Sequence, residues 1–300
     1  MKMRELDFSI ILIISISSIC LSHQSSGNWT YSGEHGPENW SGVCKNGNRQ
    51  SPINIVTDDT VKADLGSLIF TRYDFAYTGT LTNNGHSLQI TLSGVPVVLT
   101  GGGLTSTYVL EQMHFHWGAE HTIDGVRDAL ELHLVHYDKQ YGNVSIASQS
   151  HNGISVVAVL FKLSDDDNEK LYPILKAAEA VSEWVGMSSV EIQRKVIPMQ
   201  LLPNDRTTFY RYEGSLTTPG CQEAVTWFIM SEKLSISEAQ LKVFKSIRTN
   251  HGVLKQNYRP TQNIGDRKVY HHLLGYTSSS PTIFVNYLFI SMIAFYIILN

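Results

Sequence analysis

The sequence predicts one mainly β domain, and three observations support this fold class. Short segments in which apolar and polar residues alternate recur along the body of the chain, from Leu68 to Ile229. Alternation of this kind is typical of strands with one buried face. Helical periodicity is confined to two stretches, and neither an internal repeat nor a linker divides the body. Without its two apolar ends the chain keeps about 250 residues, which is within the range of a single large β domain.

The first predicted strands follow an irregular segment. Residues 29–52 are rich in glycine, proline, asparagine and serine, so they are expected to lie over a surface without regular structure. Strand patterns begin near Leu68 and continue through Leu81, 88–92 and 97–99. The Asn-Asn-Gly sequence at 83–85 is a turn signal between two of these strands. The glycines at 101–103 lack the lysine of a phosphate-binding loop, so a turn is expected there too.

Further strands are expected at 108–117, 130–137 and 154–163. The last of these is almost wholly apolar, which is typical of a central strand covered on both faces. Helices are expected at 168–181 and 237–247, and Ser237 is suited to cap the second one. A late strand is expected at 224–229.

Both ends of the chain have the composition of processing signals. The apolar run 8–21 follows Lys2 and Arg4, and residues 1–22 are expected to be a secretory signal peptide. A second apolar run, 283–299, has no lysine or arginine after it and is preceded by small residues at 277–280. We expect residues 277–300 to be the signal for a glycolipid (GPI) anchor, with a membrane-spanning helix as the alternative. Either one would attach the protein to a membrane.

Charge and cysteine content agree with an exported protein. The net charge is −4, with acidic and basic residues mixed along the chain, so nucleic acid is not an expected partner. Of three cysteines, Cys20 would leave with the signal peptide, and Cys44 and Cys221 are then expected to pair in an oxidising compartment. Three N-glycosylation sequons begin at Asn28, Asn39 and Asn143. We therefore expect the secretory pathway and the extracellular face of the plasma membrane.

A histidine cluster is the strongest chemical signal in the sequence. On a strand over 112–118, Gln112, His114 and His116 share one face, because successive side chains alternate. If the segment 130–136 forms a neighbouring strand, His133 could complete a three-histidine metal site. Catalytic zinc sites use three protein ligands and keep a fourth position open. A histidine on a strand is more often structural, but Gln112 and Glu131 stand where ligating histidines need outer hydrogen-bond partners.

Several motifs stand together between Trp29 and about Tyr270. They are Ser-Pro-Ile-Asn-Ile (51–55), Asn-Asn-Gly-His (83–86), Gln-Met-His-Phe-His-Trp-Gly (112–118), Glu-His-Thr (120–122), Glu-Leu-His-Leu-Val-His (131–136), Gly-Ser-Leu-Thr-Thr-Pro (214–219) and Asn-Tyr-Arg-Pro (257–260). In these motifs the chain resembles the α-carbonic anhydrases, whose three-histidine zinc site is the standard example of this arrangement. Cys44 and Cys221 stand where the extracellular, membrane-attached branch of that family has its single disulfide.

The resemblance implies a fold and a set of site residues. It implies a catalytic domain over 27–273 with a large, mostly antiparallel twisted sheet, short peripheral helices and the metal site on the sheet. Zn²⁺ would be the cofactor. Its implied ligands are His114, His116 and His133, and the implied partners of those ligands are Gln112, Glu131 and Asn257.

The resemblance also implies roles around the substrate. Thr217 would orient the zinc-bound hydroxide and donate its own proton to Glu120, and Thr218 would contact bicarbonate. His86 would shuttle protons, with Tyr31 and Gln89 along the proton path; from the residues alone, His86 reads as an ordinary turn residue. His121 and His136 are expected to be structural. The apolar wall beside CO₂ would be formed by Val135, Val156, Leu216 and Trp227.

The implied function is the reversible hydration of CO₂ to bicarbonate and a proton. An acatalytic binding module is the alternative, and the presence of all three histidines disfavours it. A zinc protease is disfavoured because no His-Glu-x-x-His helix occurs. Only Gly118 and Ala119 separate Trp117 from Glu120, where many relatives have a longer loop, so a tight turn is expected beside the site. The oligomeric state is left open.

Overall fold

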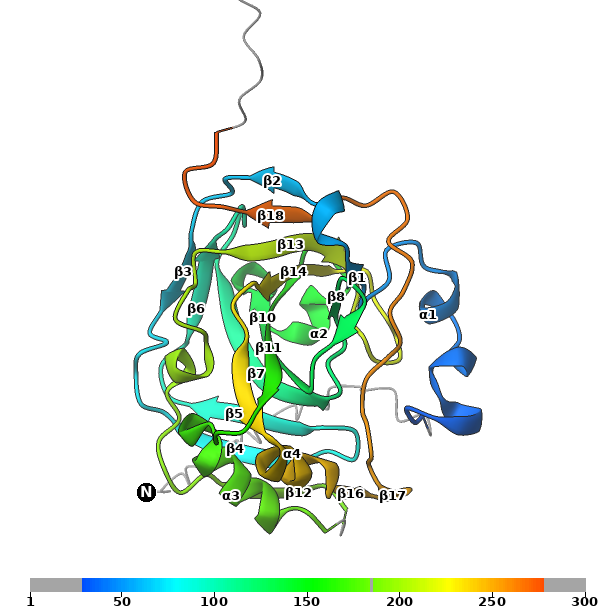
Figure 1. Cartoon of the computed structure of the whole chain (residues 1–300), viewed down its shortest axis with the longest axis vertical. Coiled ribbons are helices and arrows are strands. Elements are labelled where there is room, and N and C mark those ends of the chain that lie inside the picture. The colour runs from blue at the N-terminus through cyan, green and yellow to red at the C-terminus, as the bar shows by residue number, and fades with distance from the viewer. Residues whose placement is uncertain (1–28, 184–185, 278–300) are drawn as a thin grey trace, which may run out of the picture.

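The computed structural model describes residues 29–183 and 186–277. A sheet of thirteen strands forms the centre of the protein (Figure 1). Its main path runs, in spatial order, through β12 (Ser188–Glu191), β4 (Thr78–Asn83), β5 (Leu88–Ser93), β7 (Tyr108–Trp117), β10 (Leu130–Asp138), β11 (Ile154–Ser164), β14 (Val225–Met230), β13 (Phe209–Gly214), β18 (Tyr270–His272) and β2 (Val61–Ala63).

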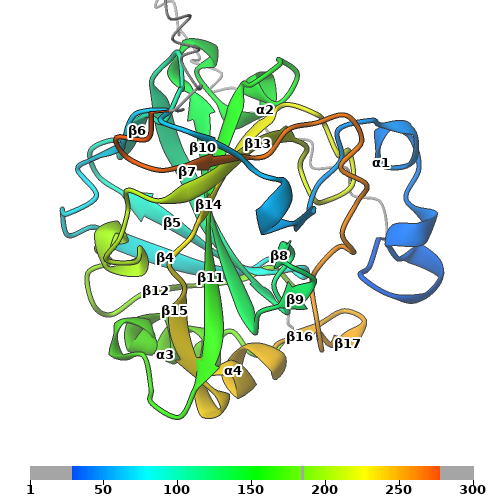
Figure 2. The ribbon, with the colours of Figure 1, turned by 45° about the horizontal axis from the view of Figure 1, so that its top comes forward.

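Three further strands join the same sheet away from this path. β15 (Leu234–Ser237) pairs with β11, while β3 (Leu68–Thr71) pairs with β6 (Val98–Gly101), which in turn pairs with β7. Most pairs are antiparallel; the parallel ones are β11 with β14 and with β15, and β18 with β2. Neighbouring strands are rotated relative to one another, so the sheet is twisted, as Figure 2 shows. The predicted mainly β, mostly antiparallel twisted sheet is therefore confirmed.

Two smaller sheets lie beside the central one. The first contains β1 (Asn54–Ile55), β8 (Thr122–Ile123) and β9 (Val126–Arg127), and the second is the hairpin of β16 (Arg248–Thr249) and β17 (Gly252–Val253). The turn signals were also correct. Asn83 pairs with Leu88 across the end of the β4–β5 hairpin. Gly101 has φ 78°, and a Cβ there would come within 2.1 Å of the Ser67 carbonyl oxygen, so only glycine fits this turn.

The helices are short and peripheral, as expected. α3 (Tyr172–Ala180) and α4 (Glu238–Lys245) lie together at one end of the sheet, beside β4 and β12, and β18 and β2 lie at the other end (Figure 1). α3 begins four residues after the predicted start at 168, because a 3-10 turn over Glu169–Leu171 precedes Pro173. Ser237 caps α4 as predicted, accepting a hydrogen bond from the Gln240 backbone N–H at 3.1 Å.

The N-terminal segment is nearly irregular, in agreement with the prediction. It forms 3-10 turns at Gly33–His35 and Pro37–Asn39 and the single-turn helix α1 (Val43–Asn46), and a second single-turn helix, α2 (Val144–Ala147), lies elsewhere. The predicted Cys44–Cys221 disulfide is present and ties this segment to the loop after β13 across 177 positions of sequence. None of the helices in the described ranges combines the length and the apolar character that crossing a bilayer requires.

The sheet separates two apolar clusters. One contains Met113 and Phe115 of β7 and is covered by α3 and α4. The other contains Val135 of β10, Val156 of β11 and Trp227 of β14. β11 serves both clusters, and its first eight residues are buried, as predicted for a strand covered on both faces. Because side chains alternate along β7, the histidines between Met113, Phe115 and Trp117 point toward the second cluster.

Candidate metal centre

Register between β7 and β10 brings the three histidines together. His133 lies directly opposite His114, and Glu131 lies directly opposite His116. One ring nitrogen from each histidine lies within 4.8 Å of the others, and the Nδ1 atom of His133 is 3.3 Å from the Nε2 atom of His114. His116 and His133 are buried, and His114 is half-buried. The sequence hypothesis that His133 lies on a strand adjacent to the histidine pair is confirmed.

Each histidine is oriented by a hydrogen bond from its other nitrogen. His114 Nδ1 is 2.8 Å from Gln112 Oε1, His116 Nδ1 is 2.6 Å from the Asn257 carbonyl oxygen, and His133 Nε2 is 2.7 Å from Glu131 Oε1. Because these oxygens accept, the three nitrogens must donate. The remaining lone pairs are then on Nε2 of His114, Nε2 of His116 and Nδ1 of His133, and these are the atoms that converge.

The donor set fits a zinc ion. Within the described ranges, the buried Nε2 atom of His116 has no hydrogen-bond partner, which is costly for a polar atom that no ion or ligand satisfies. Burial, followed by the neighbouring histidines, holds the pKa of His114 well below its ordinary value, and burial also lowers the pKa of His116. Neutral imidazoles are the form that binds a metal. His114, His116 and His133 could therefore hold Zn²⁺ with an open fourth position.

Glu131 serves two histidines at once. Its Oε1 atom is 2.7 Å from both His133 Nε2 and His121 Nδ1, and its Oε2 accepts from the His121 backbone N–H at 2.8 Å. Burial alone would raise its pKa, but the two histidines hold the pKa of Glu131 well below its usual value. His121 Nε2 lies 2.7 Å from the Tyr212 hydroxyl, so both ring nitrogens of His121 have protein partners. His121 is therefore structural, as expected.

His136 is structural as well. It sits three residues beyond His133 and faces away from the metal ligands. Its Nδ1 donates to the Ser155 carbonyl oxygen at 3.1 Å, and its Nε2 contacts the Tyr73 hydroxyl. Burial lowers the pKa of His136 to about 4.

Glu120 is buried beside the histidines, but the predicted link to Thr217 is not formed. Glu120 Oε1 accepts from the Arg259 backbone N–H at 2.8 Å, and its Oε2 lies 3.6 Å from His116 Nε2. Among the residues with described positions, Oε2 has no hydrogen-bond partner, and no hydrogen bond joins it to Thr217, which is also buried. Glu120 thus has a free acceptor, and the hydroxyl that was predicted to donate to it belongs to a buried residue, Thr217.

The short connection from Trp117 to Glu120 is a tight turn, as the sequence indicated. Gly118 has φ 75°, and a Cβ on it would come within 2.5 Å of the Tyr258 ring. The backbone N–H groups of Gly118 and Ala119 donate to the carbonyl oxygens of residues 129 and 128 at 2.9 and 3.0 Å. The positive φ of Gly118 and these two backbone hydrogen bonds allow the chain to turn from β7 to Glu120 within two residues.

Arg259 is the residue that sequence reasoning missed. Its buried guanidinium donates to Gln50 Oε1, to the Ser51 carbonyl oxygen and to the Cys44 carbonyl oxygen, at 2.8 to 2.9 Å. It therefore joins the disulfide-bonded segment to Glu120. The signal available in the sequence was the Asn-Tyr-Arg-Pro motif at 257–260, which contains this arginine.

The predicted apolar wall is one continuous cluster. Val135, Val156 and Trp227 are buried together, and Leu216 packs against them half-buried. The Trp227 ring centroid lies 4.9 Å from that of His133, so the wall begins beside the metal ligands. Thr218 is half-buried in the turn that Cys221 closes, where the Cys221 backbone N–H donates to the Thr218 carbonyl oxygen.

His86 stacks on Trp29 at the outer side of the site. Their ring centroids are 3.7 Å apart and their planes differ by 9°. Burial, and next the charge of His251, lower the pKa of His86 to about 4. Tyr31 is buried, and burial followed by the charge of Glu120 raises its pKa well above the ordinary value. Gln89 lies opposite His114 in the β5–β7 pair.

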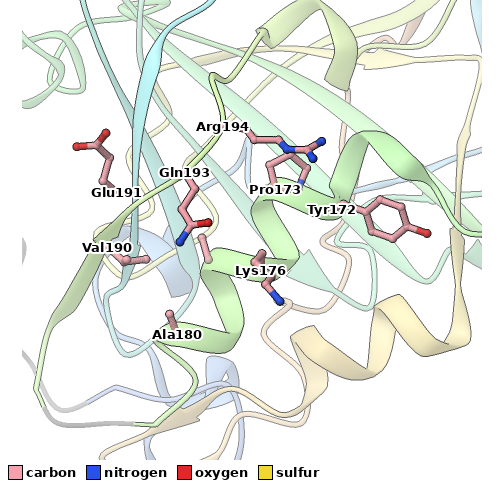
Figure 3. A pocket seen from close by; sticks show the side chains of 9 residues that line it. Tyr172, Pro173, Lys176, Ala180, Val190, Glu191, Gln193 and Arg194 are labelled. Atoms are coloured by element: carbon pink, nitrogen blue, oxygen red, sulfur yellow. The ribbon is translucent and has the colours of Figure 1, made fainter.

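Two cavities lie outside the histidine cluster. One of about 500 Å³ is lined by residues that include Trp29, Tyr31, His86 and His251. The other, of about 290 Å³, lies between α3 and the segment around β12 and contains none of the predicted site residues (Figure 3). The first cavity therefore belongs to the surroundings of the site, and the second does not.

Several sequence predictions concern the surface or the ends of the chain. Asn39 and Asn143 are exposed, and Asn143 also caps α2 by accepting from the Ile146 backbone N–H at 2.9 Å. Asn28, the signal peptide at 1–22 and nearly all of the anchor signal at 277–300 lie outside the described residues.

Comparison with known proteins identifies the family. The sequence model of the eukaryotic-type carbonic anhydrase family matches residues 35–273. A putative carbonic anhydrase 3 of Caenorhabditis elegans is 36% identical over 263 residues, which cover 82% of this chain and 98% of that protein. Carbonic anhydrase 6 of Mus musculus is 34% identical, with 86% of this chain and 85% of that protein covered. Carbonic anhydrase 4 of Rattus norvegicus is 35% identical, with 82% of each covered. The chain therefore belongs to the eukaryotic-type carbonic anhydrases, enzymes of CO₂ hydration.

Proposed function

We propose that this enzyme interconverts CO₂ and bicarbonate with a zinc ion held by His114, His116 and His133. The observation that carries the proposal is the convergence of one ring nitrogen from each of the three histidines, with the other nitrogen of each ring held by an outer partner and His116 Nε2 left without one. When bound, zinc supplies a Lewis acid that lowers the pKa of a coordinated water to about 7, for which carbonic anhydrase itself is the reference case. The ligands carry no negative charge, so they leave the positive charge of the ion undiminished.

The protein's own groups would prepare the position of the substrate. CO₂ is uncharged, and the wall of Val135, Val156 and Trp227 offers it an apolar surface next to His133. Leu216 extends that wall toward Thr218, whose side chain we assign to bicarbonate. The wall is continuous with the buried apolar cluster on this side of the sheet.

We assign an orienting role to Thr217 and Glu120. The free Oε2 atom of Glu120 is the acceptor that a rotated Thr217 hydroxyl needs, and Arg259 holds the other carboxylate oxygen in place. Once its proton is directed to Glu120, the Thr217 oxygen can only accept a hydrogen bond from the reacting oxygen. An acceptor at that point requires the reacting oxygen to direct its hydrogen toward Thr217. A lone pair of that oxygen is then directed at CO₂.

The proton produced at the site would leave through His86. In the stacked position its pKa of about 4 makes it a poor acceptor, so His86 would accept the proton with its ring turned away from Trp29 and nearer the site. Tyr31 and Gln89 lie along this route, Gln89 opposite His114 and Tyr31 within the field of Glu120. Both can hydrogen-bond to water without releasing a proton of their own.

The surroundings of the enzyme are part of the proposal. We assign residues 1–22 to a signal peptide, 27–273 to the catalytic domain and 277–300 to a GPI-type anchor signal, which places the domain on the extracellular face of the plasma membrane. The Cys44–Cys221 disulfide and the exposed sequon residues Asn39 and Asn143 support export, with Asn28 as a third acceptor. Treatment of expressing cells with a phosphatidylinositol-specific phospholipase should release the enzyme; retention would favour a spanning helix.

The central test combines activity and metal content. Stopped-flow CO₂ hydration and metal analysis would be run on the wild type, on His116→Ala and on His151→Ala, an exposed histidine that pairs with Glu213. We expect one zinc per chain and full activity in the wild type and in His151→Ala, and loss of both in His116→Ala. Full activity in a zinc-free protein would refute the mechanism. A folded wild type without zinc or activity would support a binding module instead.

A further inference from the structure

The cavity beside Trp29 is lined by three histidines, His35, His86 and His251, and the mechanism above uses only His86. His251 lies in the two-residue turn between β16 and β17, and both His251 and His86 line this cavity of about 500 Å³. His251 is exposed, whereas His86 is half-buried under Trp29. Of the two imidazoles, His86 is therefore nearer the site and His251 nearer the solvent.

Hydrogen bonds fix the two histidine turns relative to each other. The Asn83 side chain donates to the Arg248 carbonyl oxygen at 2.9 Å, at the start of the His251 hairpin. The same side chain accepts from the Gly85 backbone N–H at 3.1 Å, within the His86 turn. The hairpin is shaped further by the His251 backbone N–H, which donates to Thr249 Oγ1 at 3.0 Å. One buried asparagine thus connects the backbones that carry both imidazoles.

The inner histidine is also tied to the metal ligands. Asn257 Nδ2 donates to the His86 carbonyl oxygen at 3.1 Å, and the Asn257 carbonyl oxygen is the partner of His116 Nδ1. The His86 turn is therefore anchored to the site, and the His251 hairpin is anchored to the His86 turn. The spacing of the backbones that carry the site, the inner histidine and the outer histidine is set by hydrogen bonds of two buried asparagine side chains, Asn83 and Asn257.

We propose that His251 is the second member of a proton relay, accepting the proton from His86 across this cavity and releasing it to solvent. In this step an N–H bond of the His86 imidazolium breaks and an N–H bond forms on the neutral His251 imidazole, directly or through water. A buffer base or water then takes the proton from His251. Each transfer moves one proton and its positive charge from one base to the next, and no oxidant or reductant takes part.

The electrostatics of the cavity favour transfer in the outward direction. Burial against Trp29 disfavours the charged form of His86, so an imidazolium that turns into the cavity readily loses its proton. His251 is exposed and can carry the charge at lower cost. The other titratable groups that line the cavity are the buried Tyr31 and the exposed Glu34, His35 and Lys255. Glu34 favours a positive charge there, and Lys255 disfavours it.

The relay rests on the proposed function and is tested on the full chain. Turnover would be measured by stopped flow at low and at high imidazole concentration for the wild type, His251→Gln and His35→Gln. His35 lines the same cavity but has no electrostatic effect on His86 among the causes that shift its pKa. At low buffer, His251→Gln should lower kcat by about threefold or more, with kcat/KM unchanged and full recovery in imidazole. His35→Gln should match the wild type.

A double variant and a spectroscopic titration make the test decisive. In the His86→Ala background, adding His251→Gln should cause no further loss, because both residues act on one path. By NMR, His251→Gln should raise the pKa of His86, since a neighbouring positive charge is removed. Unchanged kcat at low buffer, an equal loss in His35→Gln or additive losses in the double variant would overturn the relay. If the wild type itself does not hydrate CO₂, the proposed function fails, which is a separate result.

Discussion

His133 and His114 stand directly opposite each other on β10 and β7, with Nδ1 of one 3.3 Å from Nε2 of the other. Opposed residues in an antiparallel pair have close Cβ atoms, so this register alone brings two rings to a shared point. His116 joins them from two residues along β7. A rigid ladder therefore holds the ligands at a spacing that depends little on side-chain flexibility, which is the preorganisation that a metal site requires.

Replacing Glu131 should weaken metal binding without removing a ligand. In Glu131→Gln, an amide oxygen at the Oε1 position can still accept from both rings, but the amide NH₂ group then faces the His121 backbone N–H, which is also a donor, and the negative charge beside His133 is lost. Loss of such an outer partner typically costs about 10- to 100-fold in metal affinity. Competition for zinc with a chelating dye would measure the change. Glu191→Gln, on the edge strand β12, is the control, and equal affinities in the two variants would contradict this role.

Removing the Arg259 side chain should destabilise the fold. Three buried acceptors, on Gln50, Ser51 and Cys44, would lose their donor, and each unsatisfied group costs roughly 1–3 kcal/mol. We expect Arg259→Ala to lower the free energy of unfolding by about 3 kcal/mol or more, measured by urea denaturation. Arg206→Ala, which loses one half-buried contact to the Pro203 carbonyl oxygen, is the control and should change stability far less.

Stability should fall as pH decreases from about 6.5 to about 4, in part because of His136. Its pKa is lowered to about 4 in the folded protein, whereas an unfolded chain has the ordinary value near 6.5. Between these values the unfolded state binds one more proton, so acid favours unfolding, by about 3 kcal/mol at the lower limit. Urea denaturation across this range would show the loss. In His136→Gln the pH dependence should be shallower, and an identical slope would refute the assignment.

The Trp29 stack should control the acidity of His86. In Trp29→Ala the imidazole loses its burial against the indole, so the pKa of His86 should rise from about 4 toward its ordinary value. Histidine signals in an NMR titration report this directly. Trp29→Phe keeps an aromatic face and should leave the pKa low. If both variants titrate like the wild type, the stack has no part in setting the pKa of His86.

Much of the site follows from local stereochemistry and could be recognised in the chain. Alternation on a strand puts His114, His116 and Gln112 on one face regardless of what surrounds them, and the same rule excludes His136 from the face of His133. Turns at glycines and the Ser237 cap are equally local. The exact start of α3 could not be recognised in this way. Pro173 favours the first turn of a helix, so α3 begins after the 3-10 turn that Asn168 caps.

Other parts depend on contacts that no short segment contains. His116 receives its partner from the carbonyl of Asn257, 141 positions away, and Arg259 reaches both Glu120 and the disulfide-bonded segment. The stack of His86 on Trp29 and the nearness of His251 likewise join separate regions. Periodicity specifies which face a side chain takes, because that depends on the backbone alone. The register between strands, the hydrogen-bond partners of the site residues and their pKa values depend on contacts between segments that are distant in sequence. Only the folded protein therefore decides them.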